Sequence, residues 1–294
     1  MPAQKLSSGG GRAATWEEAV RWLISQPDQA EFVRDCYFDL PLVDAAERYV
    51  SSAEWRVVRR WIPGDPGVAL DLGAGNGITS YALAREGWSV TSVEPDPSDL
   101  VGAGAIRSLA DSVSFRVEVV SEFGESLPFA DASFDLVLCR QVMHHARDLK
   151  QFCREIGRVL RPGAVFVAIR DHVISGPAQL PKFLASHPLH RLYGGENAFT
   201  VAQYADAIRG AGLAIERRFG SFDSPVNYAP QTPETISQEV ARRLRAIPGA
   251  GVLAHALLTG ALTQPAAFWA LSRLDRRPGR LASFVCRKPA AGAQ

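Results

Sequence analysis

ALDLGAGNGITSYALAREGWSVTSVEPD, residues 69–96, joins a short apolar run, three alternating glycines, a helical pattern, a second apolar run and an acid. Gly73, Gly75 and Gly77 can adopt positive φ angles, and without side chains they let backbone N–H groups approach a ligand closely. The helix that follows adds the positive end of its dipole. The pattern predicts a strand, a ligand-binding turn, a helix and a second strand.

Strand and helix patterns continue to alternate outward from this unit. Because apolar strands alternate with helices, the sequence predicts an α/β protein with a parallel sheet that helices cover on both faces. The predicted strands span residues 67–73, 88–95, 112–120, 134–139, 164–170, 213–220 and 281–288. The predicted helices of this region span residues 78–87, 98–110, 148–160 and 200–212, with Ser98 as the N-cap of the second.

The N-terminal part is predicted to be helical. Thr15 and Glu18 form a capping-box pattern ahead of a helix that Pro27 ends. We expect residues 1–14 to be a disordered tail, residues 15–62 a helical cap and residues 63–290 the main domain.

The composition is typical of a globular protein, with 294 residues, 47% of them hydrophobic and 21% charged. The net charge of +1 indicates no particular class of partner, but residues 241–288 carry nine basic residues and one acid, which suggests an anionic partner there. The four cysteines form no CxxC pair and no apolar signal segment is visible, so we expect reduced thiols and a cytoplasmic location. These cysteines are Cys36, Cys139, Cys153 and Cys286.

Two classes of ligand suit the glycine turn: the pyrophosphate of a dinucleotide, and the amino-acid end of S-adenosylmethionine. A dinucleotide site is typical of the pattern G-x-G-x-x-G, whereas Ile78 stands at its sixth position here. Asp71, in the preceding strand, fits better with a cationic ligand end. The spacing therefore favours S-adenosylmethionine over the cofactor of a dinucleotide-dependent oxidoreductase.

The segment DLGAGNG, residues 71–77, resembles motif I of the class I S-adenosylmethionine-dependent methyltransferases. Residues 125–145, ESLPFADASFDLVLCRQVMHH, and residues 160–170, LRPGAVFVAIR, resemble later signatures of that family in the same order. The resemblance covers residues 67–172, and more weakly 198–220, and is closest to the type 11-like, small-molecule branch. It implies a Rossmann-like, doubly wound sheet of seven strands with the last antiparallel. To this the sequence adds an N-terminal helical cap and a helical insertion between the last two strands, where the family typically has a short hairpin.

The same resemblance implies S-adenosyl-L-methionine as the cofactor. Glu94 stands 19 residues after Gly75, where the family holds both ribose hydroxyls with a carboxylate. Phe123 occupies the place of the usual acid that contacts the adenine amine, so Glu122 or Glu125 is expected to supply that acceptor. The expected cofactor-binding residues are Asp71, Gly73, Ala74, Gly75, Asn76, Gly77, Glu94, Pro95, Glu122, Phe123, Gly124, Glu125, Arg140 and Gln141.

Three histidines are the predicted catalytic residues. His144 and His145 follow the fourth strand and His172 ends the fifth, at the edge where α/β sheets bind ligands. A neutral imidazole suits a general base that removes a proton from an acceptor hydroxyl or amine. Alternatively, at least one of the pair His144–His145 only orders its loop. No metal is expected.

Residues 172–198 are predicted to form a substrate loop, because polar and aromatic residues gather beside the same edge. An ordinary surface loop is the alternative, and His187 and His190 with Glu196 are an alternative set of metal ligands. The expected substrate-binding residues are Arg170, His187, His190, Arg191, Tyr193 and Asn197.

A helical insertion is expected at residues 222–281. Within it, residues 246–272 carry no formal charge, but Pro248 and Pro265 interrupt them. This composition favours a buried or interfacial helix, acting as a lid over the substrate, over a membrane span. Peripheral membrane contact through residues 242–280 is a further hypothesis.

The expected function is methyl transfer to oxygen or nitrogen of a small molecule, with a saccharide or natural-product scaffold favoured. A lipid-linked acceptor and a non-catalytic cofactor-binding protein are the alternatives. No nucleic-acid partner is expected, because the D/N-P-P-Y/F/W motif of adenine methylation is absent after the fourth strand. The sequence indicates no particular oligomeric state.

Overall fold

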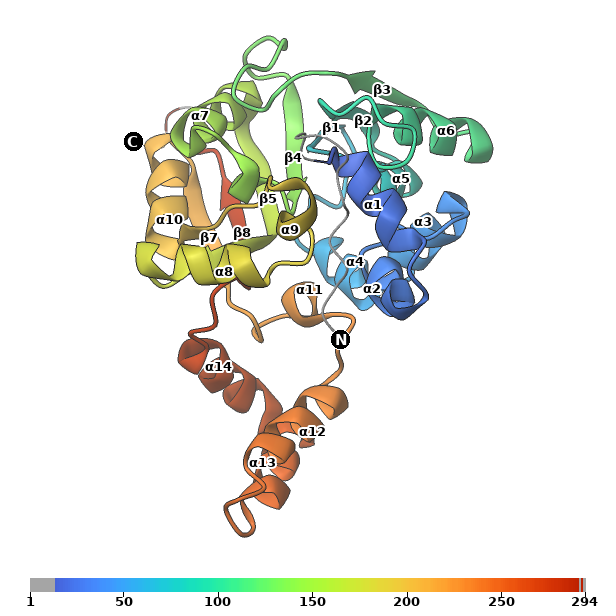
Figure 1. Cartoon of the computed structure of the whole chain (residues 1–294). Coiled ribbons are helices and arrows are strands. Elements are labelled where there is room, and N and C mark those ends of the chain that lie inside the picture. The colour runs from blue at the N-terminus through green and yellow to red at the C-terminus, as the bar shows by residue number, and fades with distance from the viewer. Residues whose placement is uncertain (1–13, 291, 293–294) are drawn as a thin grey trace.

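A mixed sheet forms the centre of the computed structural model, which describes residues 14–290 and residue 292 (Figure 1). The predicted tail, residues 1–14, therefore lies outside the described residues except for residue 14. The strand order is β3-β2-β1-β4-β5-β8-β7, and β6 pairs with the end of β5. The strands are β1 (Val68–Leu72), β2 (Ser89–Val93), β3 (Val117–Val120), β4 (Phe134–Arg140), β5 (Leu160–Ile174), β6 (Phe199–Thr200), β7 (Ala214–Phe219) and β8 (Arg280–Arg287).

Strand direction follows the prediction. Strands β1 to β5 pair in parallel, and β8 runs antiparallel between β5 and β7. The doubly wound arrangement with an antiparallel last strand is therefore confirmed. Within the described residues, the two-residue strand β6 adds one strand to the predicted seven.

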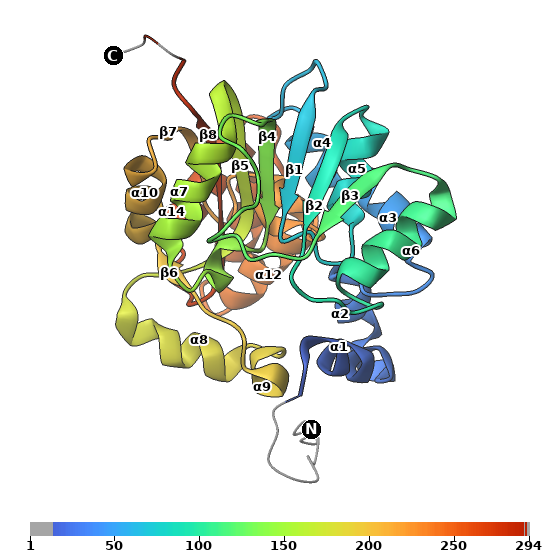
Figure 2. The same ribbon diagram turned by 90° about the horizontal axis from the view of Figure 1, so that it is seen from above.

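Helices cover both faces of the sheet (Figure 2). One face packs against α7 and α10, where Phe152 and Tyr204 join the core. The other face packs against α4, α5 and α6, with Trp55 and Tyr81 in the core. The helices of these layers are α3 (Leu42–Val50), α4 (Ala53–Val58), α5 (Ile78–Arg85), α6 (Ala103–Val113), α7 (Leu149–Val159) and α10 (Val201–Gly210).

Short helices gather at the carboxyl edge of the parallel strands. Thr15 and Glu18 form the predicted capping box at the start of α1, and each side chain accepts the other's backbone N–H. Figure 2 shows α1 at the same end of the molecule as α8 and α9. These short helices are α1 (Trp16–Ile24), η1 (Pro27–Gln29), α2 (Ala30–Asp35), η2 (Met143–His145), η3 (Pro177–Gln179), α8 (Leu180–Ser186) and α9 (His190–Tyr193).

Several element boundaries differ from the sequence prediction. The strand predicted for residues 112–120 begins only at Val117, because the chain up to Val113 belongs to α6. Helix α6 begins at Ala103 with Gly102 as its N-cap, because the Ser98 hydroxyl instead accepts the N–H groups of Leu100 and Val101 in a preceding turn. Strand β5 continues past its expected end at residue 170, because its last residues pair with the start of β8.

The insertion between β7 and β8 contains α11 (Pro225–Tyr228), α12 (Pro233–Arg243), α13 (Ala250–Thr259) and α14 (Gln264–Leu274). Helices α12 to α14 project away from the sheet (Figure 1). The single helix expected over residues 246–272 is wrong, because the chain breaks between Thr259 and Gln264 at a turn that contains Gly260. None of the helices in the described part is both long and apolar enough to cross a membrane.

Candidate active site

The glycine turn lies at one wall of a cavity of about 1000 Å³ at the carboxyl edge of the sheet. Gly75 has a φ of 56°, and a Cβ atom added there would meet no atom within 4 Å, so this position opens onto free space. Gly77 has a φ of 87° and forms the N-cap of α5. Both positions need left-handed backbone that other residues adopt at a cost. The turn therefore brings bare backbone to the cavity wall, as predicted.

Glu94 directly follows β2 and contacts this turn. Its carboxylate accepts the Gly75 N–H at 2.8 Å and the Asp96 N–H at 3.0 Å. Burial raises the pKa of the Glu94 carboxyl to about 7, although both hydrogen bonds act in the opposite direction. A largely buried carboxylate beside a bare glycine turn can accept two hydroxyl donors of a ligand.

The cavity is lined by all the predicted cofactor-binding residues except Asp71 and Gly77. Asp71 lies behind the turn, where its carboxylate accepts the Ser80 hydroxyl at 2.6 Å and burial raises its pKa to about 7. Asp71 therefore supports the turn through α5, because Ser80 is on that helix.

Phe123 and Glu122 both line the cavity. The Phe123 ring is 51% exposed, and the Arg147 guanidinium lies 5.0 Å from its centroid. Glu125 is already engaged, because its carboxylate accepts the backbone N–H of Arg147 at 2.8 Å. No described residue holds the Glu122 carboxylate in a hydrogen bond, so Glu122 is the better placed of the two acids to accept a ligand's amine.

Arg140 and Arg170 share one buried carboxylate that the sequence did not reveal. Glu54, on α4, accepts Arg140 at 2.7 and 3.2 Å, and Arg170 lies 3.5 Å away. Arg170 also donates to the carbonyls of Val226 and Ala229, so it fastens the start of the insertion. Both arginines line the cavity, but their guanidinium groups are already paired.

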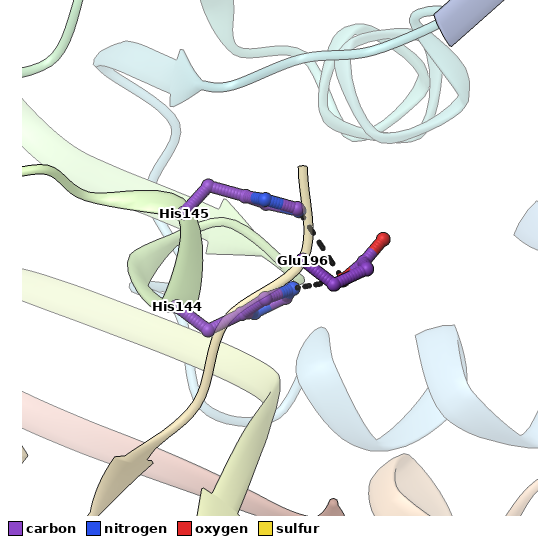
Figure 3. Close-up of side chains that lie close together, drawn as sticks. All are labelled: His144, His145 and Glu196. Carbon is purple, nitrogen blue, oxygen red and sulfur yellow. Dashed lines mark ion pairs between the residues drawn. The ribbon is translucent and has the colours of Figure 1, made fainter. Parts of the chain in front are cut away.

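The three predicted catalytic histidines line the same cavity and lie close together. The ring centroids of His144 and His145 are 4.1 Å apart, and those of His144 and His172 are 4.8 Å apart. Figure 3 shows Glu196 from the loop before β6 facing the first two rings, with its Oε2 3.4 Å from His144 Nε2 and 3.9 Å from His145 Nε2. The sequence predicted that these histidines lie at the same edge of the sheet, as they do, but it gave Glu196 only as an alternative metal ligand.

The protonation of the histidines differs. Burial lowers the pKa of His144, but hydrogen bonds to Asp171 and Glu196 outweigh it and raise the pKa to about 9. Burial and the neighbouring His144 charge lower the pKa of His172 to about 3, and the same causes lower the pKa of His145. At neutral pH, His145 and His172 are neutral and His144 is protonated.

Part of the predicted substrate loop reaches the cavity. His187 and Tyr193 line it, whereas His190, Arg191 and Asn197 do not. The Tyr193 hydroxyl donates to Glu196 Oε1 at 2.8 Å, so this loop holds the carboxylate in place.

Several aromatic side chains from the N-terminal helices line the cavity near Tyr193. Trp16 lies 4.9 Å from the Tyr193 ring and 5.6 Å from the Phe38 ring, between ring centroids, and Phe32 also lines the cavity. The cap therefore covers the cavity, whereas no residue from 231 to 278 in the described chain lines it. The expectation that the apolar segment 246–272 is a lid over the substrate is wrong, because α13 and α14 project away from this edge.

The comparisons with known proteins agree with this geometry. Residues 70–168 match the family model described as a methyltransferase domain. A ubiquinone biosynthesis O-methyltransferase of Methylobacterium nodulans is 31% identical over 57% of this chain and 68% of its own length. A protein of the same name from Rhizobium leguminosarum bv. trifolii is 30% identical over 54% of this chain, and the match spans 63% of that relative.

A solved structure also shares the fold. Geranyl diphosphate C-methyltransferase from Streptomyces coelicolor A3(2), solved with Mg²⁺, geranyl diphosphate and S-adenosyl-L-homocysteine, superposes with a TM-score of 0.56. The sequence identity is 17%, and the match covers 91% of this chain and 87% of the other. At 17% identity, this likeness shows a shared fold and nothing more.

Proposed function

Because the chain belongs to the class I S-adenosylmethionine-dependent methyltransferases, whose cofactor is S-adenosyl-L-methionine, we propose that it methylates a hydroxyl group of a small natural product. One observation carries the proposal: a single cavity runs from the Gly75–Glu94 wall to the histidines and Glu196. Cofactor and acceptor can therefore meet without leaving a shared, partly closed space.

The residues present fit the cofactor. Gly75 offers bare backbone for its amino-acid end, Glu94 a carboxylate for the ribose hydroxyls, and Glu122 an acceptor for the adenine amine beside Phe123. When bound, S-adenosylmethionine supplies an electrophilic methyl group, whose bond to sulfur breaks as a bond to the acceptor oxygen forms. The chain contributes position and a site from which the cap excludes water.

The acceptor's proton is assigned to the histidines. His144 is a poor proton acceptor, because Asp171 and Glu196 keep it protonated at neutral pH. His145 and His172 are neutral and line the cavity, so either can accept a hydrogen bond from the acceptor hydroxyl.

The walls of the cavity favour an apolar scaffold over a saccharide. Trp16, Phe32 and Phe38 line the cavity, and aromatic surface recognises flat or apolar ligands. The names of the relatives, O-methyltransferases of ubiquinone biosynthesis, support oxygen over nitrogen as the methylated atom.

The experiment incubates the purified chain with S-adenosylmethionine and a panel of phenols, aliphatic alcohols and sugars. Mass spectrometry then detects S-adenosylhomocysteine together with the methylated product. Turnover of phenols alone supports the proposal, whereas turnover of sugars alone contradicts the apolar scaffold. Tight cofactor binding without turnover of any acceptor favours the alternative of a non-catalytic cofactor-binding protein.

A second candidate, methylation of a lipid-linked acceptor at a membrane surface, is favoured by the projecting helices. Large apolar side chains are exposed on and beside α13 and α14: Ile247, Val252, Leu253, Leu257, Leu262, Trp269 and Leu274. Basic side chains flank them: Arg242, Arg243, Arg245, Arg273, Arg276 and Arg277. Apolar side chains beside cations suit the interface of an anionic bilayer.

Liposome flotation tests this second candidate. Binding to vesicles that contain phosphatidylglycerol, lost when Val252, Leu253 and Leu262 are all replaced by Ser, supports it. Absence of binding to both anionic and neutral vesicles contradicts it.

A further inference from the structure

Three donor atoms converge at the histidine end of the cavity. His144 and His145 come from η2, and Glu196 comes from the loop between α9 and β6 (Figure 3). Oxygen Oε2 of Glu196 lies 3.4 Å from His144 Nε2 and 3.9 Å from His145 Nε2, and the three donor atoms all lie within 4.8 Å of one another. Ligands about 2.1 Å from a tetrahedral ion stand about 3.4 Å apart, so this set needs only small side-chain movements to close on an ion.

The remaining ring nitrogen of each histidine is held by an acceptor. His144 Nδ1 lies 2.9 Å from Asp171 Oδ1, and His145 Nδ1 lies 3.1 Å from the Gly195 carbonyl. Because a carboxylate and a carbonyl only accept hydrogen bonds, both Nδ1 atoms carry the proton and both rings direct Nε2 toward Glu196. Histidine ligands of metals are oriented in this way, with the second nitrogen donating to a carboxylate or carbonyl.

The carboxylate is oriented as well. The Tyr193 hydroxyl occupies Glu196 Oε1 at 2.8 Å, which leaves Oε2 facing the two imidazoles. Glu196 is 8% exposed, so it is a buried charge whose partners are these side chains. Buried charges in proteins are paired or bind metals.

We propose that His144 Nε2, His145 Nε2 and Glu196 Oε2 bind one divalent transition-metal ion of the zinc type. Two imidazoles and a carboxylate are the protein ligands of catalytic zinc sites and of non-haem iron sites, which keep positions open for water or substrate. His145 and Glu196 line the cavity, so the open positions face the space of the acceptor. The ion takes the place of the His144 Nε2 proton.

The ion would hold the acceptor's hydroxyl oxygen and favour loss of its proton, as metals do for bound water. This assigns His145 to the ion and leaves His172, whose Nδ1 lies 2.8 Å from the Gly279 carbonyl, to take the proton. That role rests on the proposed methyl transfer, whereas binding of the ion does not. The proposal departs from the expectation, made from the sequence, that the site needs no metal.

A second trio, His172, His187 and Glu196, shares the carboxylate and is the competing set. Its His187 offers Nδ1, 3.9 Å from Glu196 Oε1, but that nitrogen already accepts the His190 N–H at 3.4 Å. Oε1 in turn is occupied by Tyr193. His187 Nδ1 and Glu196 Oε1 are thus both engaged in other hydrogen bonds. The trio of His144, His145 and Glu196 is therefore the better site.

Equilibrium dialysis of untagged, chelator-treated protein against Zn²⁺ tests the proposal, with metal measured by mass spectrometry and geometry read from the visible spectrum of the Co²⁺ form. We expect roughly one ion per chain, and affinity about tenfold or more weaker in His145→Ala and in Glu196→Gln. His255→Ala is the matched control, because His255 lies on α13 and outside the cavity lining, and it should bind like the wild type. Far-UV circular dichroism checks that each variant is folded.

Three outcomes overturn the assignment: no stoichiometric binding of Zn²⁺ or Co²⁺, binding that survives both substitutions, or binding lost in His187→Ala but not in His145→Ala. A thermal shift with S-adenosylmethionine is recorded on the same samples. A cofactor shift without metal binding means that the metal site fails while the proposed function stands. Metal binding without a cofactor shift means that the metal site stands while the proposed function fails.

Discussion

Nδ1 of His144 lies 2.9 Å from Oδ1 of Asp171, and the same oxygen accepts the His144 backbone N–H at 3.1 Å. Asp171 is fully buried on β5. His144 lies 27 residues earlier in the chain, on η2, which follows β4. The Asp171 carboxylate therefore holds both the backbone and the ring of His144 in place. Through Asp171, strand β5 therefore supports the histidines of the neighbouring site.

Removing this carboxylate is predicted to destabilise the protein. Asp171→Ala leaves two buried N–H donors of His144 without their acceptor, so the free energy of unfolding should fall by about 1–3 kcal/mol. Asp171→Asn keeps one acceptor oxygen and should cost less. Urea denaturation of metal-free protein measures both, and equal losses in the two variants would contradict the role given to the hydrogen bonds.

Glu94 is predicted to control cofactor affinity. Glu94→Ala removes the carboxylate that faces the cavity beside Gly75, so the thermal shift caused by saturating S-adenosylmethionine should shrink strongly. A ligand at about 100 times its dissociation constant stabilises by roughly 2.7 kcal/mol, which differential scanning fluorimetry resolves.

The control for that measurement is Glu216→Ala, which removes an exposed carboxylate on the edge strand β7. It should respond to the cofactor like the wild type. An undiminished shift in Glu94→Ala, or a shift with NAD in either protein, would contradict the assignment of this wall.

The pH dependence of stability should report Asp71. Burial raises the pKa of this carboxyl from an ordinary 3.8 to about 7, so the folded state binds the proton more tightly than the unfolded state. Its stabilising contribution is present below about pH 4 and is lost as the pH rises through 7. Asp71→Asn should flatten the fall in unfolding free energy between about pH 4 and pH 7, and it keeps an acceptor for Ser80.

Urea denaturation at four pH values across that range measures the slope, and an unchanged slope in the variant would contradict the perturbed pKa. Glu94, whose pKa is also raised to about 7 by burial, contributes a slope of the same sign. The variant therefore removes part of the pH dependence, and Glu94→Gln should remove a further part.

Gly75→Ala separates backbone strain from ligand contact. The added methyl group meets no protein atom within 4 Å, so the cost to the free protein is the left-handed φ of 56°, about 1 kcal/mol. In the cofactor complex the methyl group occupies space at the turn, so affinity should fall by more than stability does.

Gly64→Ala is the matched control, because Gly64 also has free space around it but no positive φ angle. It should change neither stability nor the cofactor-induced shift. Full cofactor affinity in Gly75→Ala would mean that the ligand does not approach the turn closely.

The sequence predicted the features that are local in the chain. The glycine turn, the capping box at Thr15 and the acid at the end of β2 each depend on residues a few positions apart or on one βαβ unit. Their physical requirements, a left-handed backbone or a hydrogen bond to a nearby N–H, are therefore visible as residue types at fixed spacing.

The partners missed by sequence reasoning are distant in the chain. Glu54 meets Arg140 over 86 positions, and Gly195, next to Glu196, meets His145 over 50. Such pairs arise only when the sheet and cap assemble, and a single acid in a helix or loop gives no signal of its own. The position of α12 to α14 was missed for the same reason, since an uncharged segment can be buried, interfacial or exposed.

Glu54 is predicted to be the most sensitive of these missed residues. It is 2% exposed and pairs with Arg140 and Arg170, so Glu54→Gln leaves two guanidinium groups near a neutral amide in a largely buried position. Breaking one partner of a buried ion pair costs about 3–5 kcal/mol, and chemical denaturation should show a loss of that order. Glu86→Gln, which removes the partner of Arg59 in an exposed pair, should cost about 1 kcal/mol or less. Similar losses in the two variants would mean that Glu54 does not hold the cap, the end of β4 and the start of the insertion together.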